Sequence, residues 1–423
     1  MQGTDAEDPI SRLRMENRKK ILAHRKEDRE SFFKQKRLKF CEVEALVSSV
    51  TNEQFEKLVL ELKLKKPHVD ALKAIKRNCC TSVRTEAFFR IEGGFNGLVR
   101  FLLGKDAHLQ LEAVACLTNL ACCSHKAAQR IAKTVGPYLV SFIGSGSYYL
   151  QDQCAWAAGN VANDCFKCFS LLKAQGIVPA LLTLLKSPSS EVVKSAVYAL
   201  HACTKYGDPD LRSLAELKNL ECLLSLIEQK NIEKSVLSSA GFTLSNIFYL
   251  AAMHNYEISN HVAEIVSNCL YNNISSTKRD ILIALPLVRC LGFMTLQDNQ
   301  ICRFLLEESN FHLSTVQILN SEFHCLKVEF LWVLTNIAAY GEISTSLIDL
   351  KAVLNMIEFS TTLLDNSCMQ VLYYLCTIIV KSDSIREMLY EQDVILKIQP
   401  LLNSEESILR QVAETFLSII NKT

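Results

Sequence analysis

A repeat of about forty residues runs through this chain of 423 residues and limits what it can fold into. The phrase LTNLA at 117–121 recurs as AGNVA at 158–162, LSNIF at 244–248 and LTNIA at 334–338. When full and degenerate copies are aligned, this asparagine, or the residue that replaces it, falls at positions 78, 119, 160, 202, 246, 293, 336 and 377, with steps of 41 to 47 residues. We call these positions the asparagine column. No secondary-structure period gives that spacing, so the unit is a copied structural module.

Each unit has the pattern of short helices. A turn rich in Gly or Pro opens an apolar helix, as in GGFNGLVRFLL at 93–103 and GIVPALLTLL at 176–185. A short polar break then leads to a second apolar helix, which carries the asparagine column. Such a unit cannot bury its apolar face alone, and stacked neighbours bury it instead. We therefore predict an all-α, right-handed armadillo-repeat superhelical solenoid of about eight to nine repeats over residues 66–423.

Charge separates a basic head from a mildly acidic body. Residues 12–39 hold twelve Lys and Arg against four acids, a net charge of +8, whereas residues 1–11 carry three acids and no base. The whole chain has a net charge of +1, which leaves −4 for residues 40–423. We expect a disordered acidic tail over 1–11, a basic helix over 12–40, and a linker with a capping helix over 41–65.

The seventeen cysteines are scattered through apolar helical stretches, and no secretory signal peptide precedes them. This pattern suits a reducing cytosol or nucleus, where cysteine serves as a small hydrophobic residue. Cys165 and Cys168 form a lone CxxC. Without a second pair, or a His pair at ligand spacing, that is a weak metal signal, so we expect structural thiols and no metal.

The apolar runs are short for a membrane span. ILIALPLV at 281–288 is followed by Arg289, and VLYYLCTIIV at 371–380 is followed by Lys381. A spanning helix needs about 20 apolar residues. We therefore predict buried helices and no span, with a membrane-associated protein as an alternative.

Catalytic motifs are absent from the sequence. It has no Gly-rich phosphate loop after a strand, no HExxH and no GxSxG, and its nine histidines form no ligand cluster. We expect no enzymatic activity and no cofactor.

The stretch QDQCAWAAGNVANDC at 151–165 places four polar or aromatic residues on one helix stripe, at spacings i, i+3, i+7 and i+11: Gln153, Trp156, Asn160 and Asp164. An asparagine amide can clamp the backbone of an extended peptide, at about 1 kcal/mol per bond. A tryptophan face attracts Lys or Arg by about 0.5–2 kcal/mol, and the aspartate can accept an ammonium group. Repeated once per unit on solvent-facing positions of a concave groove, the stripe predicts a receptor for extended basic peptides. Alternatively, the asparagines bond to the neighbouring repeat and hold the stack together.

These residues resemble the third armadillo repeat of importin-α, the adaptor that carries nuclear localisation signals. EFLWVLTNIAAYG at 329–341 is similar to the seventh repeat of that family, and PLVRCLGFMTLQD at 286–298 to the sixth, with Pro286 and Arg289 in place. The similarity covers most of residues 66–423. It implies a major-site-like set of peptide contacts at Asn119, Gln153, Trp156, Asn160, Asp164 and Tyr198. It implies a minor-site-like set at Arg289, Glu329, Trp332 and Asn336, with further groove rungs at Phe242 and Asn246.

The chain also departs from the family pattern. Ala115 and Tyr198 replace tryptophans, and Ala202 replaces an asparagine, beside the major-site-like set. Other family positions hold residues that do not match: Cys123, Ala128, Phe293, Tyr373 and Thr377. Two binding sites that each lack some of the family's residues (thinned sites) fit a divergent importin-α-like branch, whose members are called transmembrane and coiled-coil domain-containing proteins.

The basic head resembles the importin-β-binding segment of importin-α. The resemblance implies that importin-β, or the protein's own groove, receives Arg25, Lys26, Lys34, Lys36 and Arg37. The alternatives are a solvated or coiled-coil helix and a nucleic-acid-binding arm.

The resemblance thus implies an import adaptor in cytoplasm and nucleus that binds basic localisation-signal peptides of cargo proteins and recruits importin-β. We expect no nucleic-acid partner and no membrane span. The alternative is an armadillo scaffold that has lost signal binding.

Overall fold

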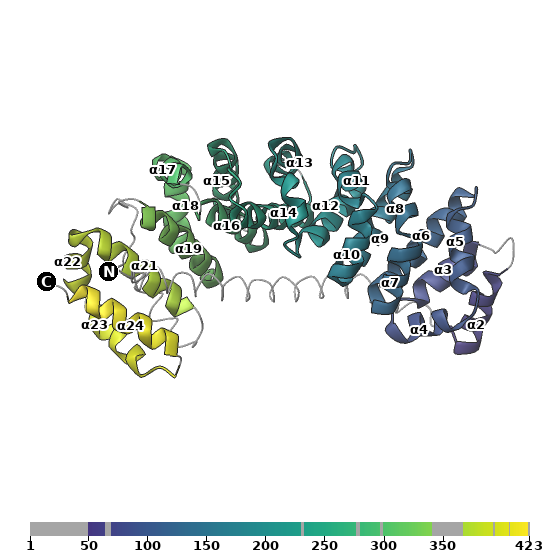
Figure 1. The fold of residues 1–423 in the computed structure, drawn as a ribbon, viewed down its shortest axis with the longest axis horizontal. Helices are drawn as coiled ribbons and strands as arrows, with labels where there is room; N and C mark the ends of the chain where they lie inside the picture. The colour runs from purple at the N-terminus through teal and green to yellow at the C-terminus, as the bar shows by residue number, and fades with distance from the viewer. Residues whose placement is uncertain are drawn as a thin grey trace, which may run out of the picture.

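The protein is described here from a computed structural model, which places residues 50–63, 69–229, 232–275, 280–296, 299–340, 367–391, 394–405 and 407–421. The head residues Arg25, Lys26, Lys34, Lys36 and Arg37 lie outside this set. The described residues form helices joined by short turns and contain no strand (Figure 1). This confirms the predicted all-α solenoid.

A row of long helices runs the length of the elongated, arched array, and each helix in the row packs against the next (Figure 1). Each unit has up to three helices, and the helices of this row are the third in each unit. They carry the asparagine column. They are α3 (Val69–Asn78), α6 (Ala107–Cys123), α9 (Tyr148–Asp164), α12 (Ser190–Thr204), α14 (Lys234–Met253), α16 (Ile281–Met294), α19 (His324–Tyr340), α21 (Ser367–Lys381) and α24 (Ser407–Ile420).

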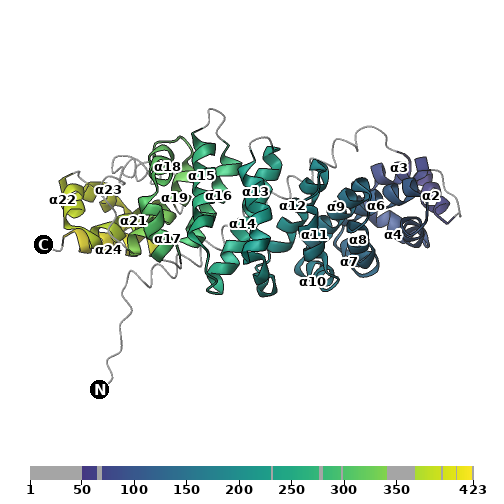
Figure 2. The same ribbon diagram turned by 90° about the horizontal axis from the view of Figure 1, so that it is seen from above.

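Shorter helices flank this row, as the view from above also shows (Figure 2). The second helices of the units are α2 (Asn52–Glu61), α5 (Gly94–Leu102), α8 (Gly136–Ile143), α11 (Ile177–Leu184), α13 (Leu217–Glu228), α15 (Asn260–Ile274), α18 (Ser309–Leu319) and α23 (Val394–Ile398), the last continued by the 3₁₀ helix η3 (Gln399–Asn403). First helices open most units: α4 (Ser82–Arg90), α7 (His125–Thr134), α10 (Phe166–Ala174), η1 (Pro209–Ala215), α17 (Asn299–Glu307) and α22 (Asp383–Glu391).

Turn residues set where these helices begin. Gly93 and Gly176, at φ 85° and 88°, precede α5 and α11 in the left-handed conformation that glycine adopts readily. Asp106 caps α6 by accepting from the backbone N–H groups of His108 and Leu109. Ser189 is the N-cap residue of α12, and its side chain makes no capping hydrogen bond.

One continuous apolar core runs through the array, from Phe55 in α2 to Ile420 in α24. Most of the described cysteines are buried in it and none forms a disulfide. Because each interface is shared by two units, removal of one unit would expose the apolar faces of its neighbours.

The longest helix that the structure describes, α14, is apolar and long enough to cross a membrane on length and composition alone, although the sequence did not single it out. In the structure, 83% of its apolar window is buried inside the protein. It packs between α12 and α16. Its apolar composition is therefore accounted for by its central place in the stack.

Candidate functional site

Helix α9 carries the predicted stripe of Gln153, Trp156, Asn160 and Asp164, because it extends without a break from Tyr148 to Asp164. Ser147 caps its first turn by accepting a bond from the Leu150 N–H. Trp156 is half-buried, and the Gln153 side chain donates to Asp152 at 3.2 Å. The structure therefore places the four residues on one helix, as their spacing predicts.

The asparagine column makes hydrogen bonds from each repeat to the one before it. Four amide nitrogens donate to the preceding third helix: Asn119 to the Lys76 carbonyl at 2.9 Å, Asn160 to the Thr118 carbonyl at 3.0 Å, Asn246 to the Thr204 hydroxyl at 3.1 Å, and Asn336 to the Gly292 carbonyl at 3.0 Å. Two of the acceptors, the carbonyls of Lys76 and Gly292, lie in the last turn of their helices, where carbonyls lack an intrahelical partner. The column therefore contributes to the stacking of the repeats, whatever else it binds.

Several predicted groove residues do not face solvent as we expected. The exposed fraction is 3% for Asn160, 1% for Asn246, 5% for Arg289, and 7% for both Phe242 and Trp332. Their hydrogen-bond and ring partners lie on neighbouring third helices, which explains why these side chains are buried. Their role in peptide binding stays a prediction.

The aromatic column stacks between repeats by a rule that the sequence did not reveal. This column comprises the aromatic residues four positions before the asparagine column, and three of them, Tyr198, Phe242 and Trp332, lie against the residue one position before the asparagine column of the preceding unit. A Cβ built on Gly159 would fall 2.6 Å from the Tyr198 ring, and one built on Gly292 would fall 1.8 Å from the Trp332 ring. Phe242 meets His201 edge to face, with the ring centres 5.9 Å apart. Tyr198 also donates its hydroxyl to Asn160 Oδ1 at 2.8 Å.

Arg289 and Glu329, predicted as minor-site-like contacts, form an ion pair between α16 and α19. Arg289 Nε and Nη2 lie 3.0 and 2.9 Å from Glu329 Oε1, and the two side chains are 6% and 12% exposed. Arg289 stands where other units have an aromatic residue, and the carboxylate of Glu329, one repeat further on, balances its buried charge.

Asp164, the predicted acceptor of a lysine ammonium group, lies where three helices meet. His125, the first residue of α7, places Nδ1 2.5 Å from Asp164 Oδ2. Cys165 follows directly and is the N-cap of α10. In the described part of the chain, His125, Asp164 and Cys165 offer ligand atoms that lie within 4.8 Å of one another and could hold a metal ion. The sequence reasoning missed His125.

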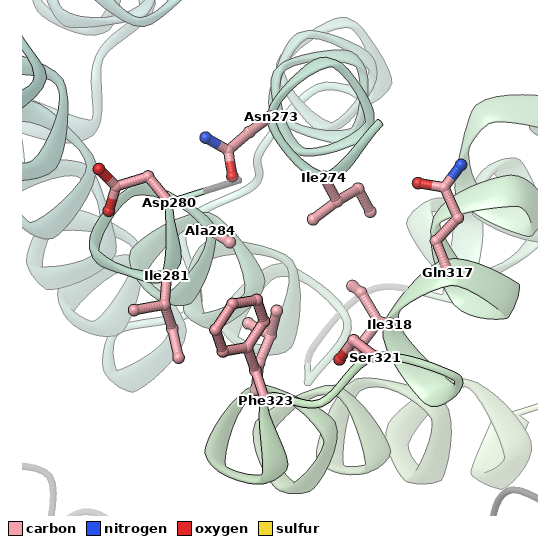
Figure 3. Close-up of a pocket in the computed structure, with 10 residues that line it drawn as sticks. Asn273, Ile274, Asp280, Ile281, Ala284, Gln317, Ile318, Ser321 and Phe323 are labelled. Carbon is pink, nitrogen blue, oxygen red and sulfur yellow. The ribbon is translucent and has the colours of Figure 1, made fainter. Parts of the chain in front are cut away.

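A small pocket lies elsewhere, among α15, α16, α18 and α19 (Figure 3). Apolar side chains such as Ile274, Ile281 and Phe323 line most of it, and Asp280 at its edge caps α16. None of the predicted binding residues contributes to it. It is smaller than a typical small-molecule site.

Comparison with known proteins supports the repeat assignment. The family model of the armadillo/beta-catenin-like repeat matches residues 167–201, which span most of α10, α11 and most of α12. Importin subunit alpha-9 of Arabidopsis thaliana is 28% identical over 235 residues, 54% of this chain and 44% of that protein. Importin subunit alpha-6 of the same plant is 30% identical over 155 residues, 35% of this chain and 28% of that protein.

Importin subunit alpha-1b of Oryza sativa subsp. japonica is 26% identical over 238 residues, 55% of this chain and 43% of that protein. The matched region thus spans less than half the length of these relatives.

Solved structures agree on the fold. The crystal structure of an engineered protein superposes with a TM-score of 0.74 at 20% identity, covering 92% of this chain and 95% of that one. A designed armadillo repeat protein gives a TM-score of 0.50 at 19% identity, over 57% of this chain and 99% of that one. At these identities the likeness concerns the fold alone.

Proposed function

Because the chain is an importin-α-like armadillo-repeat protein, we propose that it is an import adaptor that binds extended basic peptides along its row of third helices. The observation that carries the proposal is the stripe on α9, which joins Trp156, Asn160 and Asp164 on one helix. Trp156 would hold the methylene stem of a lysine and attract its charge. Asp164 would accept the ammonium group.

A second set of contacts supports the same mode of binding further along the array. Trp332 and Asn336 repeat the Trp–Asn pair on α19. Arg289 and Glu329 lie beside them, but they are paired with each other. We therefore expect this region to bind more weakly than α9 does.

The proposal includes recruitment of importin-β by residues 12–40. A net charge of +8 over residues 12–39 suits an acidic partner surface, and Lys34, Lys36 and Arg37 form a basic cluster near the end of this segment. A protein that shuttles in this way would occupy both cytoplasm and nucleus.

A scaffold that has lost signal binding is the second candidate, and one observation favours it. The amides of Asn160, Asn246 and Asn336 all bond to the preceding repeat. Ala115 and Ala202 remove a tryptophan and an asparagine from neighbouring rungs. In that case the column only stabilises the stack.

Calorimetric titration of a lysine-rich peptide separates the two candidates. The wild-type chain and a form without residues 1–40 are compared with Trp156→Ala and with Tyr149→Ala, whose ring is 77% exposed on the same helix. The adaptor should bind with about micromolar affinity. Trp156→Ala should lose about 1–2 kcal/mol, whereas Tyr149→Ala should lose nothing. Absence of binding by every form would favour the scaffold, and equal binding by all forms would mean that Trp156 is not a peptide contact.

Importin-β recruitment is tested separately by pull-down. Charge reversal at Lys34, Lys36 and Arg37 should abolish capture of importin-β by the full chain. If the wild-type chain captures none, the transport step of the proposal is wrong even where the peptide binds.

A further inference from the structure

Four side chains with metal-binding atoms meet where α7, α9 and α10 come together. His125 opens α7, Asp164 ends α9, and Cys165 is the N-cap of α10. Their ligand atoms lie within 4.8 Å of one another. The fourth, Cys168, points its sulfur to the same carboxylate oxygen that His125 contacts, at 3.7 Å from Asp164 Oδ2.

The two cysteines form a CxxC at the start of a helix. The backbone N–H of Cys168 donates to Cys165 Sγ at 3.4 Å. Metals bind the thiolate, which forms when the metal displaces the thiol proton. The short CxxC loop also brings both sulfurs to one side, as in sites where a CxxC supplies two of four ligands.

The distances suit one tetrahedral ion after small movements. Zinc binds nitrogen and oxygen at about 2.1 Å and sulfur at about 2.3 Å, so that ligand atoms around it lie roughly 3.4–3.8 Å apart. The sulfur of Cys168 already has this separation from Asp164 Oδ2. The 2.5 Å contact between His125 Nδ1 and Asp164 would open by about 1 Å, which a change of rotamer in the half-exposed histidine provides.

The second nitrogen of His125 has the kind of partner that supports a metal-bound histidine. Gln129 Nε2 lies 2.7 Å from His125 Nε2, one helical turn along α7. The orientation of a glutamine amide is assigned from its neighbours, so its oxygen can take that place and accept the Nε2–H when Nδ1 binds a metal. Such a partner fixes the ring and its tautomer.

Asp164 supplies the one carboxylate of the cluster. Within the ranges that the structure describes, it pairs with His125 and with no lysine or arginine. Phe166 and Phe169 pack with Tyr206 beside the cluster, and the Lys205 ammonium group lies over the Tyr206 ring at 4.8 Å. A metal ion could therefore take a carboxylate oxygen of Asp164 without displacing a lysine or arginine.

We propose that His125, Asp164, Cys165 and Cys168 bind one Zn²⁺ ion. Two thiolates, an imidazole and a carboxylate complete a closed tetrahedral set, which is typical of structural zinc rather than of magnesium or calcium. The ion joins the unit that begins with α7 to the one that begins with α10. It therefore fastens two neighbouring repeats at their junction.

The test is metal binding by the full chain, purified without chelators and given one equivalent of zinc. Elemental analysis after gel filtration should find one zinc per chain. Replacement by Co²⁺ should give the intense visible bands of tetrahedral cobalt together with sulfur-to-cobalt charge transfer. Zinc should also raise the thermal midpoint of wild type, since a ligand of the folded state stabilises it.

Variants assign the site to its residues. Cys165→Ser and His125→Ala should each weaken zinc binding at least tenfold and abolish or shift the cobalt bands. Gln129→Ala should weaken binding by about 10–100-fold, the usual effect of losing an outer partner. Cys222→Ser, at a half-buried cysteine of α13, is the matched control and should bind as wild type does.

Three results would overturn the proposal. The first is cobalt bound without sulfur charge transfer, and the second is zinc content that is the same in every variant. The third is the absence of bound zinc from wild type that shows native helical circular dichroism. None of these results bears on the lysine-rich peptide titration, so the adaptor proposal is judged separately.

Discussion

Substitution of Gly292 and of Trp332, singly and together, tests whether the aromatic side chains stack between repeats. The ring of Trp332 lies so close to Gly292 that a methyl group added there would fall 1.8 Å from it. A flexible side chain could swing away, but this ring is 7% exposed and also packs edge to face on Phe293, with centres 5.2 Å apart. Gly292→Ala should therefore displace the tryptophan.

The two substitutions are expected to be strongly coupled. Overpacking costs about 1–3 kcal/mol, and alanine returns about 1 kcal/mol over glycine inside a helix. Gly292→Ala alone should thus lower the free energy of unfolding by about 0–2 kcal/mol. Trp332→Ala removes a buried ring and should cost about 3–5 kcal/mol. With the ring gone, Gly292→Ala should instead stabilise the protein by about 1 kcal/mol, so the coupling energy equals the overpacking cost of about 1–3 kcal/mol.

Urea unfolding of the full chain, followed by far-ultraviolet circular dichroism, measures this cycle. Gly146→Ala is the control, because a Cβ at that glycine meets no atom within 4 Å. It should have the same effect with and without Trp332. If Gly292→Ala also costs the same in both backgrounds, the ring does not lie on this glycine and the stacking rule is wrong.

Three further predictions concern the ion pair, a buried thiol and the metal. Glu329→Ala leaves the buried guanidinium of Arg289 without its carboxylate and should cost about 3 kcal/mol in urea unfolding, whereas Glu322→Ala, at an exposed position, should cost almost nothing. Burial raises the pKa of the Cys203 thiol from its ordinary value of 9.0 to about 12. The buried thiol therefore makes its full contribution to stability below pH 9, and this contribution is lost as the pH rises toward 12. In native protein at pH 8, iodoacetamide should label the exposed Cys325 but not Cys203, as read by peptide mass spectrometry. Finally, if zinc occupies the proposed site, adding it should weaken binding of the lysine-rich peptide and chelation should restore it; titrations that superpose with and without zinc would contradict this.

The repeat period predicted the fold well because copying imposes the same burial pattern on every unit. The third helices α6, α9, α14 and α19 all carry the predicted asparagine, and the match over residues 167–201 covers one unit of this array. What the period did not reveal was where each side chain points its polar atoms. The amide of Asn160 bonds to Thr118, 42 residues earlier, and a peptide clamp would use the same amide.

The two tryptophans show the same limit. Trp156 and Trp332 each precede an asparagine by four residues and look equivalent in sequence. They differ in the residue that lies one repeat earlier, just before the asparagine column, which is Thr118 for one and Gly292 for the other. The glycine admits the ring of Trp332 deeply, and Trp156 remains half-buried. A comparison of successive units at this register would have predicted the difference.

Asp164 is the residue on which the two proposals meet. As a peptide contact it must offer a carboxylate oxygen to an ammonium group, yet His125 Nδ1 already lies 2.5 Å from Oδ2 and the Cys168 sulfur 3.7 Å from the same atom. His125 lies 40 residues before Cys165, about one repeat period, so stacking alone brings them together. A zinc ion bound there would neutralise the charge that a lysine needs, because it takes that oxygen as a ligand. Metal-free and metal-bound forms would then differ in affinity for basic peptides without any movement of the helices, and the thinned major-site-like groove would bind best when the junction between α7 and α10 holds no zinc.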